Sequence, residues 1–303
     1  MKKIVYMFNI CVAILLMSCN PINNPSANKH VFSVSADKQV HFSPGNLQYV
    51  ISKDKWQFAD NQWEYLGTAN LNNPTYDKFN EGWVSNPLSM GDVIDMFPWG
   101  KADNPTIKSA NIGECGYIEY INYIDYGTNV IDKYPANTWR TLTYEEWQYL
   151  FYGRPNANYL YAMAQVCDVN GVIVLPDDWE CPNNLFFLPG NSYGDYAEYQ
   201  TFDKKQWHAL ERTGAIFLPA AGFWRNGIKS GEIVACIIEN LQSHGYYWAN
   251  GTAFPEDYGA HVLLFAADEV YEVGYENQYL KNYKLKKLEC KNKKLKMAKK
   301  YCS

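Results

Sequence analysis

The chain has 303 residues, of which 47% are hydrophobic and 16% aromatic, enough for one large domain or two small ones with a sizeable core. Its net charge of −5 conceals a basic end, because residues 281–303 hold ten Lys and one Glu and leave −14 on the other 280 residues. A body this acidic excludes nucleic-acid binding through neutralisation of phosphates. The Lys-rich end could contact phosphates, but a lone Lys run is more typical of a solvated segment, so the sequence predicts no nucleic-acid partner.

The start of the chain predicts a lipoprotein signal peptide over residues 1–18. Two Lys precede an apolar run that is too short for a membrane span, and the run ends in LMSC, which resembles a bacterial lipobox. We expect lipid attachment at Cys19, a tether over residues 19–30, and a cell-envelope location on the outer membrane, facing either the periplasm or the exterior. The alternative is an ordinary secretion signal in which Cys19 is incidental.

The domain itself is predicted over residues 31–275, and it begins with alternating strands. Apolar and polar residues alternate between residues 31 and 58, and Ser-Pro-Gly-Asn at 43–46 is typical of a turn. The pattern predicts an antiparallel meander with one buried face. The apolar positions in this pattern are Phe32, Val34, Val40, Phe42, Leu47, Tyr49, Ile51, Trp56 and Phe58.

Two helices are predicted from their start and stop signals. Thr143 and Glu146 have the spacing of a capping box, as do Asp203 and Gln206. The first helix is expected to end at Gly153 before Pro155, and the second at Gly214. The residues expected to be buried are Leu142, Trp147, Leu150 and Phe151 for the first helix, and Trp207 and Leu210 for the second.

Short apolar runs bounded by Pro, Gly or Asp predict further strands. These runs cover residues 171–175, 185–188, 215–218, 233–238 and 262–265. Two main helices, many short strands and long loops indicate an α+β fold with short antiparallel sheets.

Several motifs together resemble a known family. RTLTYEEWQYL is similar to the R-L-P-T-E-A-E-W-E-Y signature of formylglycine-generating enzymes and sulfatase-modifying factors, whose fold is C-type lectin-like. The full set also resembles exported Bacteroidetes lipoproteins with that fold, and it covers roughly residues 31–265. The matching pieces, in chain order, are FSVSADKQVHFSPGNLQY, FPWG, WRTLTYEEWQYLF, LPDDW, ALERTGAIFLPAAGFWRNG and YYWAN.

The chain departs from that family in two places. Oxidase members use a C-terminal pair of Cys four residues apart, whereas Cys236 has no such partner, and Cys290 and Cys302 have a different spacing. We therefore expect no catalytic residue and no enzyme activity. Family members also usually end with a Gly-aromatic-Ser-Val-Arg strand. In this chain, residues 276–303 form a Lys-rich tail in place of that strand. This tail is read as disordered, as the product of out-of-frame translation, or as a basic membrane-surface helix.

Other chemistry has weak support in the sequence. The five His residues form no metal-binding spacing, and no cofactor motif is present; Asp177 and Asp178 offer carboxylates for calcium, but they are expected to cap a turn. Glu145 and Glu146 are explained by helix capping, because adjacent helical residues point about 100° apart. Arg140 is unexplained by these signals, and we expect it to pair with an acid elsewhere in the core.

The predicted ligand-binding region lies in the C-terminal half, where aromatic residues stand beside polar ones. The residues are Trp224, Arg225, Asn226, Tyr246, Tyr247, Trp248, Asn250, Glu256, Asp257 and Tyr258. They predict a glycan or protein ligand at the cell surface; the alternative for Trp224, Tyr247 and Trp248 is a place in the core. Two other functions stay open, an oxidase of the formylglycine-generating type and a structural envelope subunit without a small ligand.

Overall fold

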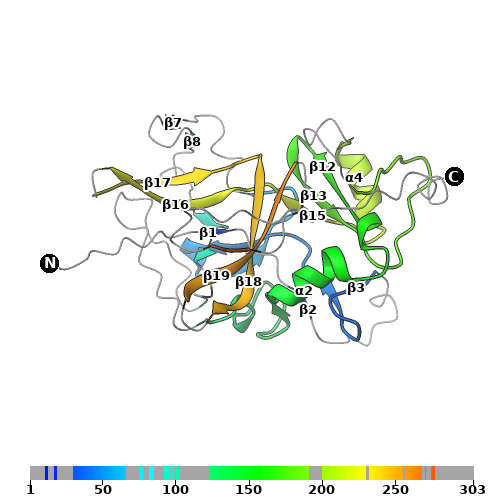
Figure 1. Cartoon of the computed structure of the whole chain (residues 1–303), viewed down its shortest axis with the longest axis horizontal. Helices are drawn as coiled ribbons and strands as arrows, with labels where there is room; N and C mark the ends of the chain where they lie inside the picture. Colours follow the sequence, from blue (N-terminus) through cyan, green and yellow to red (C-terminus); the bar gives the residue numbers. More distant parts are fainter. Residues whose placement is uncertain are drawn as a thin grey trace.

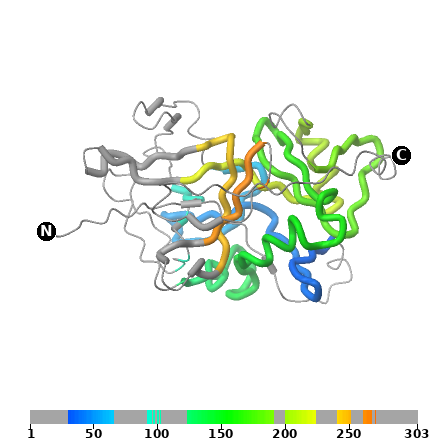
Figure 2. Tube along the Cα trace, viewed as in Figure 1, coloured from blue at the N-terminus to red at the C-terminus, as the bar shows by residue number. Residues whose placement is uncertain are grey.

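The structure is a computed structural model of the whole chain, which describes part of it in full and part by its backbone alone (Figure 2). For strand residues outside the side-chain ranges given below, the structure describes the backbone alone. The predicted lipidation site Cys19 and the tail beyond Glu276 lie outside the described residues. Side chains are described for residues 30–65, 92–95, 97, 100, 102, 123–190, 200–223, 240–250, 261–267 and 270.

The predicted meander forms two separate hairpins. Phe32–Ser33 (β3) pairs antiparallel with Gln39–Phe42 (β4), and Leu47–Val50 (β5) pairs antiparallel with Lys55–Phe58 (β6). β4 and β5 lie in different sheets, so the prediction of one continuous meander is wrong. The physical reason is that the turn at 43–46 redirects the chain from one sheet to another instead of closing a hairpin.

Burial along these hairpins follows the predicted alternation except at the end of β5, where Val50 is buried and Ile51 is exposed. Ile51 is 43% exposed, because it begins a 3-10 turn, Ile51–Lys53 (η1), instead of continuing β5. The predicted apolar positions that are buried are Phe32, Val34, Val40, Phe42, Leu47, Tyr49, Trp56 and Phe58.

A four-stranded sheet forms the centre of one half of the molecule, with strand order β14-β12-β13-β15. Its pairs are antiparallel except β12 with β14, which is parallel. The predicted strands at 171–175 and 215–218 are confirmed here. The strands are Tyr161–Val166 (β12), Val169–Val174 (β13), Thr201–Phe202 (β14) and Ile216–Pro219 (β15).

The predicted strand at 185–188 is wrong, because these residues form an irregular loop. Phe187 is 2% exposed, whereas its neighbours Phe186 and Leu188 are 69% and 42% exposed. The side chain of Gln200 bonds the backbone N–H and the carbonyl of Leu188, at 3.1 and 3.0 Å. A side-chain amide thus takes the place of a strand ladder at this position.

Both predicted helices are present, and both begin with a complete capping box. Tyr144–Gln148 (α2) is capped by Thr143 with Glu146, and Lys204–Glu211 (α4) by Asp203 with Gln206. α2 continues into one π-helical turn, Tyr149–Gly153 (η4), which the sequence did not predict. The predicted inward residues Leu142, Trp147, Leu150, Phe151, Trp207 and Leu210 are all buried.

The C-terminal half is built from long antiparallel hairpins. β16 pairs with β17, β18 pairs with β19, and β20 adds to β19. The predicted strands at 233–238 and 262–265 are confirmed as parts of β17 and β19. The strands are Phe223–Lys229 (β16), Glu232–Glu239 (β17), His244–Phe254 (β18), Asp257–Ala266 (β19) and Gly274–Glu276 (β20).

Short elements complete the sheets, and two of them belong to the predicted signal peptide. β1 lies between β10 and β16, and β2 lies between β4 and β11, so these residues pair within the uncleaved chain. Removal of the peptide stays a prediction. The short elements are Cys11–Val12 (β1), Met17–Ser18 (β2), Thr75–Asp77 (β7), Gly82–Val84 (β8), Val93–Ile94 (β9), Phe97–Pro98 (β10), Trp139–Arg140 (β11), Tyr126–Thr128 (η3) and Ala157–Tyr159 (η5).

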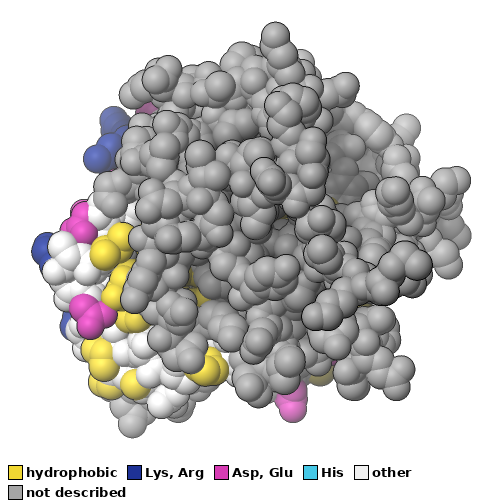
Figure 3. All heavy atoms as spheres, turned by 90° about the vertical axis from the view of Figure 1, so that its left-hand side faces the viewer, with side chains coloured by type: hydrophobic (Ala, Val, Ile, Leu, Met, Phe, Trp, Pro, Cys, Tyr) yellow, Lys and Arg dark blue, Asp and Glu magenta, His cyan; other side chains and the backbone are white. Residues whose placement is uncertain are grey.

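The described side chains form two hydrophobic clusters. One cluster lies between α2, α4 and the sheet of β12, β13 and β15, and the other lies between β5, β6 and β18. Figure 1 shows the β16–β17 hairpin extending to one side, α4 with its sheet on the other, and β18 and β19 between them. On the face in Figure 3, the described surface mixes hydrophobic side chains with acidic and basic ones. The chain is thus α+β with short antiparallel sheets, as predicted.

Candidate functional site

Three of the predicted ligand-binding aromatics lie in the core. Tyr246, Tyr247 and Trp248 on β18 are 5%, 0% and 2% exposed. The Trp248 indole N–H donates to the Phe97 carbonyl at 2.8 Å, and the Tyr247 hydroxyl donates to the Pro219 carbonyl at 3.0 Å. The alternative of a place in the core therefore describes these rings, and bonds to backbone carbonyls satisfy the polar atoms of Tyr247 and Trp248 there. Their contact with a ligand stays a prediction without support from the geometry.

The other predicted residues are placed less completely. Asn250 is half-buried on β18, and its backbone N–H donates to the Leu142 carbonyl at 2.6 Å. Glu256 lies outside the described residues. The backbone alone is described for Trp224, Arg225 and Asn226 on β16 and for Asp257 and Tyr258 on β19.

A half-exposed aromatic and polar cluster stands at the edge of this region, and we call it the aromatic rim. It consists of Phe223, Asn240, Ser243 and His244, arranged around the buried Tyr246. The Phe223 and Tyr246 rings meet edge to face at 4.7 Å, and the His244 ring stacks on Tyr246 at 6.1 Å. The Asn240 amide donates to the Tyr246 hydroxyl oxygen at 2.8 Å. The rim therefore combines an aromatic surface with amide, hydroxyl and imidazole groups.

The turn that carries the rim is held rigidly by the neighbouring sheet. Asn240 and Gln242 adopt left-handed conformations, with φ of 57° and 62°. The Asn170 backbone N–H donates to the Gln242 amide oxygen, and the Asn170 amide donates to the Gln242 carbonyl, both at 2.8 Å. These reciprocal bonds fix the turn against β13, which is the kind of preorganisation that lowers the entropic cost of binding.

Glu146, an acidic residue weighed for catalysis, has a carboxylate that is bound by side chains and backbone of the protein itself. The Glu146 carboxylate accepts two bonds from the Arg140 guanidinium, at 2.6 and 2.7 Å, one from Lys38 at 2.7 Å, and one from the Thr143 backbone N–H at 2.9 Å. Burial opposes ionisation, but these donors outweigh it and hold the pKa of Glu146 below its ordinary value. Arg140 thus pairs with an acid, as expected, but with one in its own stretch of sequence.

Asp125 is a second buried carboxylate near this pair. Burial raises its pKa above the ordinary value, and hydrogen bonds from the Gly127 and Thr141 backbone N–H groups act against that rise. The carboxylate caps the short helix η3, so its bonds serve the local chain path. These contacts explain Asp125 as a structural residue.

Asp177 was expected to cap a turn, and the structure corrects this assignment. Its carboxylate accepts bonds from the Ser33 backbone N–H at 2.9 Å and from the buried Arg154 guanidinium at 3.0 Å. Arg154 also donates to the carbonyls of Leu150, Leu160 and Leu175, at 2.7, 3.2 and 2.9 Å. Asp177 therefore ties distant segments together through the buried charge of Arg154.

Metal and redox sites have no support in the described side chains. No group of three or more His, Cys, Asp or Glu residues gathers there in a way that could hold a metal ion. Cys167 and Cys181 are free thiols, and Cys236 is described by its backbone alone. Within the described part of the chain, the helices are too short or too polar to cross a membrane.

Comparisons with protein-family models, with curated proteins and with solved structures find no match to this chain. Phe223 directly precedes the predicted residues Trp224–Asn226, whereas Asn240, Ser243 and His244 were not predicted. The available signal was the turn-forming stretch NLQSHG before the aromatic strand, where Asn and Gly mark the change of direction.

Proposed function

We propose that this chain is a cell-envelope lipoprotein whose C-type lectin-like domain, of the sulfatase-modifying-factor type, binds a glycan or protein without catalysis. The ordered motifs and the two capped helices on short antiparallel sheets support the fold. The lipobox-like end of the leader supports anchoring to the outer membrane through Cys19.

The observation that carries the binding proposal is the aromatic rim. Phe223 and His244 are half-buried, so each ring keeps exposed surface while its position is fixed by contact with Tyr246. Asn240 and Ser243 are exposed beside them; the Asn240 amide bonds Tyr246, and the Ser243 hydroxyl donates to the Asn240 carbonyl and lies 2.9 Å from Nδ1 of His244, so the polar groups of the rim are held in fixed positions. Aromatic anchors with polar neighbours on a rigid turn are typical of sites that recognise sugars or protein side chains.

Catalysis is disfavoured by the way the acidic side chains are used. Glu146 is committed to a capping box and two cations, and Asp177 to the buried Arg154. The oxidase alternative requires a Cys pair that the spacing of Cys236 does not provide. Copper-dependent oxygen consumption with a Cys-containing peptide would support that alternative over the binding proposal.

The proposal is tested by glycan-array binding of the full chain and of rim variants. We expect Phe223→Ala and His244→Ala to weaken binding by about tenfold or more, because each removes an anchor of the contact surface. Phe186→Ala is the matched control, since Phe186 is an exposed aromatic at 69% that lies outside the rim. It should leave binding unchanged, and unchanged thermal unfolding of all variants verifies folding.

Two results would contradict the proposal. Equal glycan binding by wild type and Phe223→Ala would show that the aromatic rim is not part of the binding site. An absence of glycan signal, together with stable capture of one defined envelope partner that rim variants still bind, would favour the structural-subunit reading.

A further inference from the structure

Two short strands of the predicted leader, β1 and β2, lie inside sheets of the folded chain (Figure 1). β2 pairs antiparallel with β4 on one side and with β11 on the other, so that Met17 lies opposite Phe42 of β4 and Arg140 of β11. β1 lies in the same way between β10 and β16. We call the space between β4 and β11, which β2 fills, the strand slot.

β2 supplies the strand pairing of both edges of the slot. In the described registers, β3 pairs with the first two residues of β4, so His41 and Phe42 pair with β2 alone. The two residues of β11, Trp139 and Arg140, also pair only with β2 in these registers. Phe42 and Trp139 are 9% and 8% exposed, and an unpaired backbone group among buried residues costs free energy comparable to a lost hydrogen bond. Both edges therefore need a strand in the slot.

Contacts that do not involve β2 hold the two edges of the slot in position. The Glu146 carboxylate accepts a bond from Lys38, which directly precedes β4, at 2.7 Å, and two bonds from Arg140 of β11, at 2.6 and 2.7 Å. Directly after β11, the Thr141 backbone N–H donates to the Asp125 carboxylate at 3.0 Å. Strands that flank a third strand lie roughly 10 Å apart, and the shared carboxylate fixes β4 and β11 on the two sides of that space.

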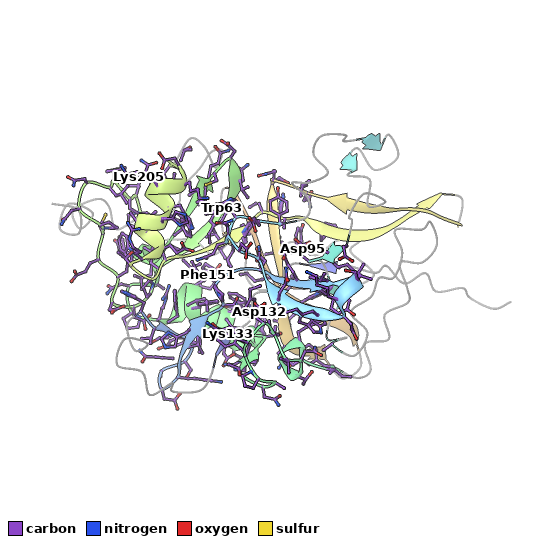
Figure 4. All side chains as sticks on the ribbon, turned by 180° about the vertical axis from the view of Figure 1, so that it is seen from behind. Trp63, Asp95, Asp132, Lys133, Phe151 and Lys205 are labelled. Carbon is purple, nitrogen blue, oxygen red and sulfur yellow. The ribbon has the colours of Figure 1, made fainter. Side chains whose placement is uncertain are left out.

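The slot borders the hydrophobic cluster that contains α2. The Phe42 and Trp147 ring centroids lie 6.1 Å apart, and Trp147 stacks on Phe151 at 6.3 Å. Phe151 lies near the middle of the molecule in the view from behind (Figure 4). A strand in the slot therefore runs along the core, where an unpaired charged side chain is costly and an apolar one is favoured.

Removal of the leader takes the strand out of the slot, and this step rests on the proposed function. Processing directly before Cys19 removes β1 and β2 together, because both precede that residue. The tether is a poor replacement, since Pro21 and Pro25 have no backbone N–H for a strand ladder. The Lys-rich residues 281–303 would bring charge to the border of the core, and a second copy of the processed chain has lost the same leader.

We infer that, after leader removal, the strand slot accepts an extended apolar strand of a second envelope protein. The leader shows which chemistry fits, because residues 12–18 read VAILLMS and are apolar up to Ser18. The incoming strand runs antiparallel to β4 and to β11, as β2 does, and pairs with both of them. This is β-augmentation, in which backbone hydrogen bonds supply affinity and alternate side chains supply specificity. The slot lies apart from the aromatic rim and binds by a different mode.

The inference is tested by peptide titration and hydrogen–deuterium exchange of the processed chain, which begins at Cys19. The probe is a synthetic peptide of residues 12–18 with two added Lys for solubility, and its control carries Met17→Pro, which removes a backbone donor inside the slot. We expect the probe to slow exchange at residues 41–42 and 139–140 by about tenfold or more, and the control to bind about tenfold more weakly. Exchange in the β5–β6 hairpin should not change. The uncleaved chain should not respond to the probe, because β2 already fills its slot.

A peptide that alternates Val and Thr tests whether a strand unrelated to the leader is accepted. It should bind within about tenfold of the probe, because its residues favour strands and augmentation uses the backbone. Phe42→Ala in the chain should weaken probe binding by about threefold or more, since Phe42 lies opposite Met17. Phe58→Ala is the matched control: it truncates a buried Phe of the β5–β6 hairpin, away from the slot, and should leave probe affinity unchanged.

Several outcomes would overturn the inference. They are slow exchange at both slot edges of the processed chain without peptide, equal binding of the probe and its Pro control, and binding of the leader peptide alone. If the processed chain folds only with the probe present, circular dichroism of the refolded mixture supports the inference, whereas a chain that stays unfolded with the probe contradicts it. Mass spectrometry of the envelope protein separates the two proposals. A retained leader would contradict the proposed function, whereas a processed chain that binds no peptide would contradict the slot alone.

Discussion

The two capped helices begin with the same local signals but serve different purposes. In α2, the capping residue Glu146 is 6% exposed and bonds Arg140 and Lys38 as well as its own helix start. In α4, the corresponding Gln206 is half-buried, and its oxygen accepts from the Asp203 backbone N–H. A capping box thus predicts where a helix starts, but it leaves open whether the start lies in the core or at the surface.

The helix ends differ in the same direction. The α2–η4 segment ends at Arg154, whose side chain is completely buried and whose pKa burial lowers to about 10, so that the guanidinium stays charged at neutral pH. α4 ends near Gly214, where a left-handed φ of 86° stops the helix. α2 is therefore joined to the core by charged contacts, while α4 carries polar side chains along one face, where Lys204 and His208 contact Trp63.

The largest expected effect concerns the buried end of α2. Arg154→Ala should lower the free energy of unfolding by about 3–5 kcal/mol, because it removes four bonds from a buried guanidinium, one of them to the Asp177 carboxylate and three to backbone carbonyls. Arg212→Ala, at the exposed C-cap of α4, should change it by less than about 0.5 kcal/mol. Chemical denaturation of both variants measures this difference, and similar losses would show that the two helix ends are not distinct.

The next effect tests the buried start of α2 through its pH dependence. The folded-state pKa of Glu146 is lowered, so its contribution to stability is complete above its ordinary value of 4.5 and is lost as pH falls through the lower folded value. Glu146→Gln should be less stable than wild type by about 1–3 kcal/mol at neutral pH. This difference should shrink below pH 4.5. If the stability difference between wild type and Glu146→Gln stayed constant below pH 4.5, the charge of Glu146 would not be the source of its contribution.

The smallest effect concerns the exposed start of α4. Asp203→Ala should cost about 1 kcal/mol, since it removes the acceptor for the Gln206 backbone N–H at 2.8 Å. Asp203→Asn keeps a capping oxygen and should recover most of that loss. Thermal unfolding compares the two variants, and a loss several times larger for Asp203→Ala would place this helix start among the core contacts, like that of α2.

Local signals in the sequence determined the start of both helices and the side that each one buries. Thr143 with Glu146 and Asp203 with Gln206 predicted the two helix starts, and the spacing of Trp147, Leu150 and Phe151 predicted a buried stripe. These features depend on residues within about four positions of one another, so the helix period is enough to specify them. The short antiparallel strands and the α+β class follow from patterns of similar range.

The tertiary structure alone decided which aromatic surfaces stay exposed. Tyr247 and Trp248 resemble binding residues in sequence, yet Pro219 and Phe97, which are distant in the chain, supply the carbonyls that hold them in the core. Trp63 gave no comparable signal, yet α4 places Lys204 and His208 beside it. Periodicity shows which residues share a face of an element, but the packing of distant segments decides which faces are covered and which can meet a ligand.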